Sequence, residues 1–327
     1  MNPLRARWLI APLAMVLAGC GTWATDSGQR AQEALGTVPV VELEPLKCTT
    51  DEANEFVAGV SYPPLDHTGA PWTDAPSVQK IIDRNALIVG VDDNTLALSA
   101  RNLLTTNLEG FEIDLAEAIA DAIDPELPVR YRIVTTADKV SAAASGEVDL
   151  SISAITINCG RAKQVAFTLP YFRITEQYLV LDDSGIATKE DSGRKCTTRG
   201  SSTTESAEDL QVDTRTECLA ALQNGDVDAI HAHETFLWGF QMQDPGTRIV
   251  PTGDPQKLYG IAVAPDRIDL VRFVNSLIAD DTFRDRLRVS YAEHFVTCEL
   301  CAFSDAPAEL PIPDLPTEWL ELPGEGG

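Results

Sequence analysis

One short turn in the sequence has the composition of an anion-binding site. Gly200, Ser201, Ser202 and Thr203 follow an expected strand and precede an expected helix. Such a turn points backbone N–H groups at a negatively charged ligand. The same residues would also serve as an ordinary helix N-cap with no ligand, and the sequence leaves both interpretations open.

Two histidines and a glutamate stand close together at His231, His233 and Glu234. Residues two apart on a strand share a face, so the two imidazoles could converge on a metal ion. A third ligand is not evident, because His67 belongs to an N-terminal spacer and His294 to a late helix. We therefore expect no metal and no cofactor.

The same residues also allow a catalytic interpretation. Glu234 is the candidate for a general acid, and a pairing of Ser201 with His233 lacks an evident third group to orient the imidazole. These arrangements are incomplete, so we do not expect an enzyme.

The central part of the chain supplies strands and helices that would position these residues. Residues 86–91 form a short apolar run that predicts a buried strand. A helical face follows Gly110, and Pro125 ends it. The face consists of Phe111, Leu115, Ala118, Ile119, Ala122 and Ile123.

The same alternation continues along the chain. Residues 129–133 alternate as a half-buried strand does, a short Ala-rich helix stops at Gly146, and residues 148–154 predict another strand. Strands that alternate with helices are typical of an α/β fold with a mostly parallel sheet.

A unit of helix end, glycine, acid and Val-Asp occurs twice, at residues 143–149 and 221–228. The repetition suggests two similar lobes, each with a glycine helix cap. In open α/β sheets, ligands bind beyond the carboxyl ends of the strands. We therefore expect residues 156–161 of one lobe and 231–235 of the other to face a ligand.

The N-terminus has the features of an export signal. Arg5 and Arg7 precede a short apolar run at residues 9–17, and Leu17-Ala18-Gly19-Cys20 follows. This ending resembles the lipobox of bacterial lipoproteins, in which the cysteine is acylated and becomes the new N-terminus. We expect residues 1–19 to be removed and a lipid on Cys20 to anchor the chain to the outer face of the cell membrane. Plain secretion with an incidental cysteine is the alternative.

Composition limits the classes of partner. Of the 327 residues, 25 are Lys or Arg and 50 are Asp or Glu, and the net charge of −25 argues against nucleic acid. Beyond the N-terminus no apolar run approaches the roughly 18 residues of a membrane span. Residues 20–75 indicate a flexible acidic, proline-containing spacer, and residues 303–327 a tail rich in proline and acids.

Acylation of Cys20 would leave six cysteines, an even number that suggests three disulfides in an exported chain. Connectivity does not follow from the sequence, so the pairs are ranked. They are Cys196 with Cys218 first, then Cys298 with Cys301, then Cys48 with Cys159. The alternative of a half zinc site at Cys298 and Cys301 needs a second pair, which is not visible.

Several motifs in fixed order resemble a known family. They are Val89-Gly90-Val91-Asp92 and residues 110–116, 146–150, 155–161 and 167–171. Together they are similar to the solute-binding proteins of polar amino-acid ABC importers (family 3), within which the chain looks most like actinobacterial glutamine/glutamate-binding lipoproteins. The resemblance covers roughly residues 80–297.

The resemblance implies a two-lobed periplasmic-binding-protein-like fold of type II. Two α/β lobes would be joined by two crossover strands and close on a ligand. Carried onto this chain, lobe 1 spans residues 76–181 and 258–302, and lobe 2 spans 182–257. The crossovers would lie near residues 179–183 and 252–258.

The resemblance also implies a ligand-binding set for an α-amino acid. Arg161 matches the arginine that grips the carboxylate, and Thr156 matches a position whose hydroxyl and N–H reach the ligand. Ser153 and Ala154 stand where carbonyls accept from the ammonium. Asp92 matches an acid beside the ligand, and its alternative role is to bond the backbone of its own loop. The turn at Gly200, Ser201 and Ser202 would hold the same carboxylate as Arg161.

The chain departs from the family pattern at this site. His233 stands where the family has an aspartate that holds the ammonium, although Glu234 is near enough in sequence to compensate. Residues 96–100 lack the usual aromatics, and Gly160 replaces an acid. An ammonium left unpaired in a dry site is costly. Either the ligand differs from glutamine and glutamate, or binding is weakened.

The resemblance implies capture of a small polar, amino-acid-like solute for an ABC permease. One alternative is a lipoprotein that passes the signal to a membrane sensor protein. Another is a lipoprotein that no longer binds a solute and acts through protein contacts. An enzyme on the same fold, as in dehydratases, is the least expected.

Overall fold

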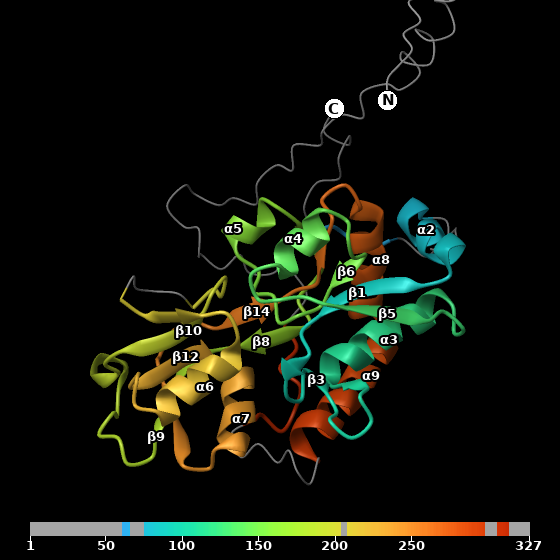
Figure 1. The fold of residues 1–327 in the computed structure, drawn as a ribbon. Helices are drawn as coiled ribbons and strands as arrows, with labels where there is room; N and C mark the ends of the chain where they lie inside the picture. The colour runs from blue at the N-terminus through green and yellow to red at the C-terminus, as the bar shows by residue number, and fades with distance from the viewer. Residues whose placement is uncertain (1–60, 66–74, 204–207, 298–305, 314–327) are drawn as a thin grey trace, which may run out of the picture. The chain divides into compact units, whose positions relative to one another are not determined.

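The computed structural model describes residues 61–65, 75–203, 208–297 and 306–313 (Figure 1). These residues contain two five-stranded sheets, one two-stranded sheet and one three-stranded sheet. No helix among them is long and apolar enough to cross a bilayer.

The first sheet has the strand order β5-β1-β6-β15-β7. β1 runs parallel to β5 and β6, whereas β15 is antiparallel to β6 and β7. The strand predicted at residues 148–154 is shorter in the structure, because β6 covers only Leu150–Ser151. Ala154, at the end of the predicted range, has a left-handed φ of 48° that does not belong to an extended strand. The strands are β1 Leu87–Val91, β5 Val129–Ile133, β6 Leu150–Ser151, β7 Ala166–Phe167 and β15 Ala262–Val263.

Helix α3, Phe111–Ile123, has the apolar face expected from the sequence. Phe111, Leu115 and Ile119 are fully buried. Gly110 precedes the helix with a φ of 134°, and a Cβ there would lie 2.4 Å from the Leu98 carbonyl oxygen. Only glycine fits this position.

The first sheet is covered on both faces. Figure 1 shows α3 and α4 on opposite sides of β1. The α3 side shares one buried cluster with α8 and α9, and Val140 and Ala143 of α4 belong to a separate cluster. The helices on this part are α2 Pro76–Arg84, α4 Lys139–Ala144, α5 Cys159–Ala162, α8 Ile268–Ala279, α9 Asp281–Tyr291 and the π-helix η3 Ala292–Val296.

The second sheet has the order β11-β10-β12-β9-β13. β10 is parallel to β11 and β12, and β9 is antiparallel to β12 and β13. The predicted disulfide between Cys196 and Cys218 is confirmed and links β10 to α6. The elements are β9 Glu176–Leu181, β10 Lys195–Thr198, β11 Leu210–Val212, β12 Ala229–His233, β13 Thr247–Pro251, α6 Arg215–Gln223, α7 Glu234–Gln243 and the 3₁₀ helix η2 Lys189–Asp191.

Two antiparallel strands, β8 Phe172–Ile174 and β14 Lys257–Tyr259, connect the two sheets. The first connection was expected near residues 179–183. However, β9 pairs within the second sheet, so this connection precedes Glu176 and the boundary drawn at residue 181 moves back.

The three-stranded sheet follows β1 and lies beside α3. It consists of β2 Asn94–Thr95, β3 Ser99–Arg101 and β4 Leu108–Glu109. Residues 96–100, which lack aromatics, belong to this part of the chain.

The two predicted glycine caps are confirmed. Gly146 and Gly225 have φ of 72° and 75°, just after α4 and α6. Both positions need the left-handed backbone that glycine adopts without strain.

The helix expected directly after Thr203 is not found among the described residues that follow it. Residues 208–214 contain β11, and α6 begins only at Arg215. Several other predictions lie outside the described residues. They concern residues 1–19, Cys20, Cys48, Cys298, Cys301 and most of the spacer and tail. Cys159 is disulfide-bonded.

Candidate functional site

Side chains that follow strands of both sheets meet in one region, which we call the inter-sheet contact. It brings together the two segments, 156–161 and 231–235, that the sequence places beyond strand ends. Its members are Asp92, Thr156, Arg161, Gly200, Ser202, Arg215, His233 and Tyr259.

Arg161 enters the inter-sheet contact from α5. The side chain of Asn158 caps this short helix by accepting from the Arg161 N–H at 2.9 Å. The guanidinium donates to the carbonyl of Thr156 at 3.0 Å and, across the two sheets, to that of Gly200 at 3.1 Å. Among the described residues it forms no ion pair with a carboxylate, and burial lowers its pKa to about 10.

The turn at Gly200 comes so close to the first sheet that a side chain would not fit. Its φ is 76°, and a Cβ there would lie 2.8 Å from the Cα of Ala137. The Ser202 hydroxyl lies 3.1 Å from that of Thr156, while Ser201 bonds within the turn to Thr203. The turn therefore touches the segments expected to contact a ligand.

His233 is buried in the middle of this region. Its Nδ1 lies 2.7 Å from the hydroxyl of Tyr259 and its Nε2 lies 3.2 Å from that of Ser202. The ring also stacks on Phe236 at 5.3 Å. Burial, followed by the charges of Lys139 and other cations, holds the pKa of His233 well below its usual range. A neutral imidazole adds no negative charge to the site.

Asp92 ends β1 and is already paired. It accepts from the Asn94 N–H at 2.7 Å, as expected of an acid that bonds its own loop, and forms an ion pair with Arg215 of α6. Burial favours a higher pKa of Asp92, but Arg215 and the Asn94 N–H outweigh it and lower the pKa. The carboxylate thus faces a cation of the protein itself.

Lys139 is the residue that the sequence analysis missed. The residue is 3% exposed, and its ammonium donates to the carbonyls of Ser153 and Ala154 at 3.0 and 3.1 Å. These are the carbonyls expected to accept from a ligand ammonium. A lysine at the first position of α4 is unfavourable for the helix dipole, and that placement was the available signal.

A buried glutamate holds the other side of Ala154. Glu112 accepts from the Ala154 N–H at 2.7 Å and from the Tyr171 hydroxyl. Burial raises the pKa of Glu112. The strained backbone of Ala154 is therefore fixed between an acceptor on its N–H and a donor on its carbonyl.

Glu234 does not join the inter-sheet contact. Its carboxylate accepts from the N–H and hydroxyl of Thr175 and from the Gln177 amide. Burial raises the pKa of Glu234. Glu234 therefore does not take the place of the missing aspartate, as its position next to His233 suggested.

His231 belongs to a cluster with Glu176 and Asp254, whose ligand atoms lie within 4.8 Å of one another. Glu176 also adjoins the inter-sheet contact, because its Oε1 lies 3.8 Å from Nε2 of His233. Lys257 pairs with Glu176, and Lys189 pairs with Asp254 at 2.9 Å. Burial, followed by the charge of Lys189, lowers the pKa of His231 to about 4. Because two lysines already balance the carboxylates, the cluster does not favour a metal cation. That the protein binds no metal stays a prediction.

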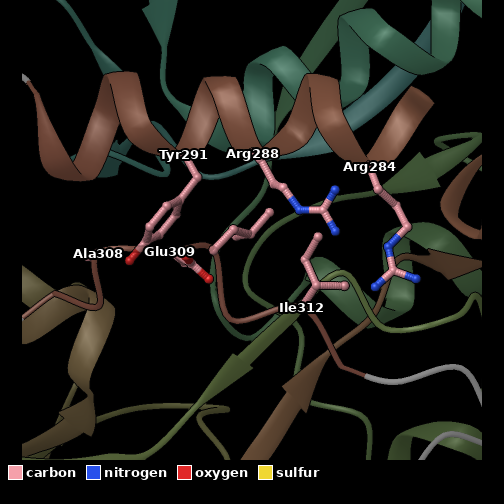
Figure 2. Close-up of a pocket in the computed structure, with 7 residues that line it drawn as sticks. Arg284, Arg288, Tyr291, Ala308, Glu309 and Ile312 are labelled. Carbon is pink, nitrogen blue, oxygen red and sulfur yellow. The ribbon is translucent and has the colours of Figure 1, made fainter. Parts of the chain in front are cut away.

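A cavity of about 380 Å³ lies elsewhere, between α9 and the segment 308–312 (Figure 2). Arg284, Arg288 and Tyr291 line it from one helix face, and the Tyr291 hydroxyl donates to the carbonyl of Pro307 at 2.8 Å. No residue of the inter-sheet contact lines this cavity.

Comparison with known proteins agrees with the arrangement of the sheets. The family model of bacterial extracellular solute-binding proteins, family 3, matches residues 87–282. A glutamine-binding protein of Geobacillus stearothermophilus is 30% identical over 201 residues, which are 58% of this chain and 77% of that protein. A glutamate-binding protein of Corynebacterium glutamicum is 28% identical over 245 residues, or 67% of this chain and 82% of that protein.

Solved structures are similar as well. The solute receptor for L-cysteine of Neisseria gonorrhoeae has a TM-score of 0.65 at 22% identity, over 71% of this chain and 98% of that one. The likeness shows a type II periplasmic-binding fold of two α/β lobes. The relatives named here are binding proteins, which fits a protein without catalytic activity.

Proposed function

Because the chain belongs to the bacterial extracellular solute-binding proteins of family 3, we propose that it captures a small polar, amino-acid-like solute for an ABC importer. Lipid on Cys20 would hold it at the outer face of the cell membrane. The relatives named for glutamine and glutamate support a solute of this size.

The observation that carries the proposal is the buried guanidinium of Arg161. It lies between the two sheets, and within the described part of the chain its hydrogen bonds go to two carbonyls. A guanidinium removed from water is stabilised by a carboxylate that accepts from two of its N–H groups at once. A solute carboxylate would therefore bind Arg161 in place of the Gly200 carbonyl, beside the hydroxyls of Thr156 and Ser202.

Binding would couple to movement of the two lobes. The direct contacts Arg161–Gly200 and Thr156–Ser202 join the two lobes. These contacts have to separate for a solute to enter, and closure around the solute would be the signal that a permease recognises.

Thermal unfolding of the full-length protein in detergent tests the proposal. We expect one or more amino acids or related carboxylates to stabilise the fold by about 3 kcal/mol at 100-fold excess over Kd. Arg161→Ala should abolish the stabilisation. Arg199→Ala is the matched control, because Arg199 adjoins the same turn but is exposed and paired with Asp213.

The direct contacts also favour a second candidate function. Lobes that bind each other through their own side chains suit a lipoprotein that acts on a membrane sensor or another partner without taking up a solute. If no small molecule of the panel changes the unfolding temperature, this second candidate replaces the first.

The anchor has its own test. Replacement of Cys20 by Ala should release the protein into the medium, and mass spectrometry of the wild-type N-terminal peptide should find acylated Cys20. Wild-type protein that is released to the same extent would contradict the anchor.

A further inference from the structure

The inter-sheet contact contains two cations that form no ion pair with a described carboxylate. Arg161 donates to two carbonyls with two of its five N–H groups. Lys139 is the second such cation, because its ammonium also donates to two carbonyls and forms no ion pair with a described carboxylate.

The nearby carboxylates are engaged elsewhere. Asp92 is paired with Arg215, and Glu112 accepts from the Ala154 N–H and the Tyr171 hydroxyl. Glu176, whose Oε1 lies 3.8 Å from Nε2 of His233, is paired with Lys257. Burial holds the pKa of Lys139 well below its ordinary value, the charges of Arg161 and Arg215 lower it further, and those of Asp92 and Glu112 only partly oppose them. A bound anion would offset these contributions.

A ligand ammonium is poorly matched to this arrangement. At the carbonyls of Ser153 and Ala154 it would meet the ammonium of Lys139, a like charge in a site removed from water. His233, whose ring is buried and hydrogen-bonded to Tyr259 and Ser202, supplies no compensating charge. A carboxylate, in contrast, would meet a cation at either place.

We propose that the solute is a small dicarboxylate without an ammonium group, with one carboxylate on Arg161 and the other on Lys139. This inference rests on the proposed function and narrows it to one chemical class. Lys139 is then the residue that determines specificity, because it fills the place of a ligand ammonium with a cation of the protein.

Glutarate and glutamate test the inference directly, because they differ only in the ammonium group. In isothermal titration of the full-length protein we expect glutarate to bind at least about tenfold more tightly than glutamate. Lys139→Met should weaken glutarate by about tenfold or more and remove the preference over glutamate. Lys163→Met is the control, since Lys163 is an exposed lysine close to Arg161 in sequence.

Each result bears on one of the two proposals. Glutamate that binds more tightly than glutarate to the wild type would overturn the inference and leave solute capture intact. Unchanged glutarate affinity in Lys139→Met would overturn the role of Lys139. If Lys139→Met fails to fold, Lys139→Arg keeps the charge and should retain the glutarate preference. The comparison of glutarate with glutamate on the wild type tests the inference without any variant. Absence of binding by every carboxylate and amino acid would refute solute capture itself.

Discussion

The guanidinium of Arg215 forms an ion pair with the carboxylate of Asp92 and joins the two sheets through buried charges. The side chains are 8% and 12% exposed. Arg215 also donates to the Thr95 hydroxyl at 3.1 Å and lies 4.0 Å over the ring of Phe236. Both charges are thus removed from water, and each depends on the other.

Loss of one member of this pair should cost more than loss of both. Arg215→Met leaves the Asp92 carboxylate buried without its cation, which we expect to destabilise the fold by about 3–5 kcal/mol. The double variant Arg215→Met with Asp92→Asn should recover most of that loss. Urea unfolding of the three proteins measures the difference, and equal stability of the single and double variants would contradict the interdependence.

The close approach at Gly200 can be separated from its backbone conformation. Gly200→Ala should lose about 1–2 kcal/mol for the left-handed φ and a further amount for the contact with Ala137. Gly225→Ala has nearly the same φ of 75° but open space around it. We therefore expect a larger drop in melting temperature for Gly200→Ala, whereas equal drops would mean that the lobes adjust without cost.

Gly185→Ala provides the baseline for this series. Gly185 has nothing within 4 Å of the added Cβ and no left-handed φ. Its melting temperature should stay close to that of the wild type.

Stability should fall in mild acid because His231 is buried as a neutral base. Its pKa is lowered to about 4 in the folded chain, against about 6.5 when unfolded. The unfolded state therefore binds more protons between these values, and stability is lost as pH falls from about 6.5 to 4. This one residue would account for about 3 kcal/mol.

Denaturant unfolding at pH 7 and pH 4 checks this assignment. His231→Gln should reduce the acid loss by about that amount relative to the wild type, although the part due to His233 remains. His294→Gln is the control, since His294 is only part-buried and bonds Asp114 elsewhere. An acid loss that is unchanged in His231→Gln would exclude His231 as its source.

The disulfide between Cys196 and Cys218 should stabilise the second lobe mainly by restricting the unfolded chain. The two residues are 22 apart in sequence, and closing a loop of that length is worth about 3 kcal/mol. The variant with both cysteines replaced by Ala should lose that amount in urea unfolding at pH 7. A loss below about 1 kcal/mol would show that the reduced chain is already restricted there.

Local patterns in the sequence predicted much of the fold. Two such features depend only on neighbouring residues, and the structure confirms both. They are the apolar face from Phe111 to Ile123 and the glycine caps at 146 and 225. The end of β6 was not predictable in this way. Ala154 turns left-handed because Glu112 and Lys139 hold it from distant parts of the chain.

The candidate site was predictable only in part. Arg161, Thr156 and His233 follow strand ends, and the structure brings them together. Arg215 gave no signal, and the place of Lys139 at the start of a helix gave a weak one, because single cations on helices are common on protein surfaces. Glu234, which stands next to His233 in sequence, turns instead to Thr175.

The sequence by itself indicated the family, the alternation of strands and helices in the first lobe, and several of the cations and hydroxyls that follow strand ends. Only the tertiary structure decided which charges are paired. Arg215 and Asp92 are 123 residues apart, and Lys139 meets carbonyls that lie beyond a strand of the sheet. Charge pairing depends on distance and burial in space, which the order of residues along the chain does not record.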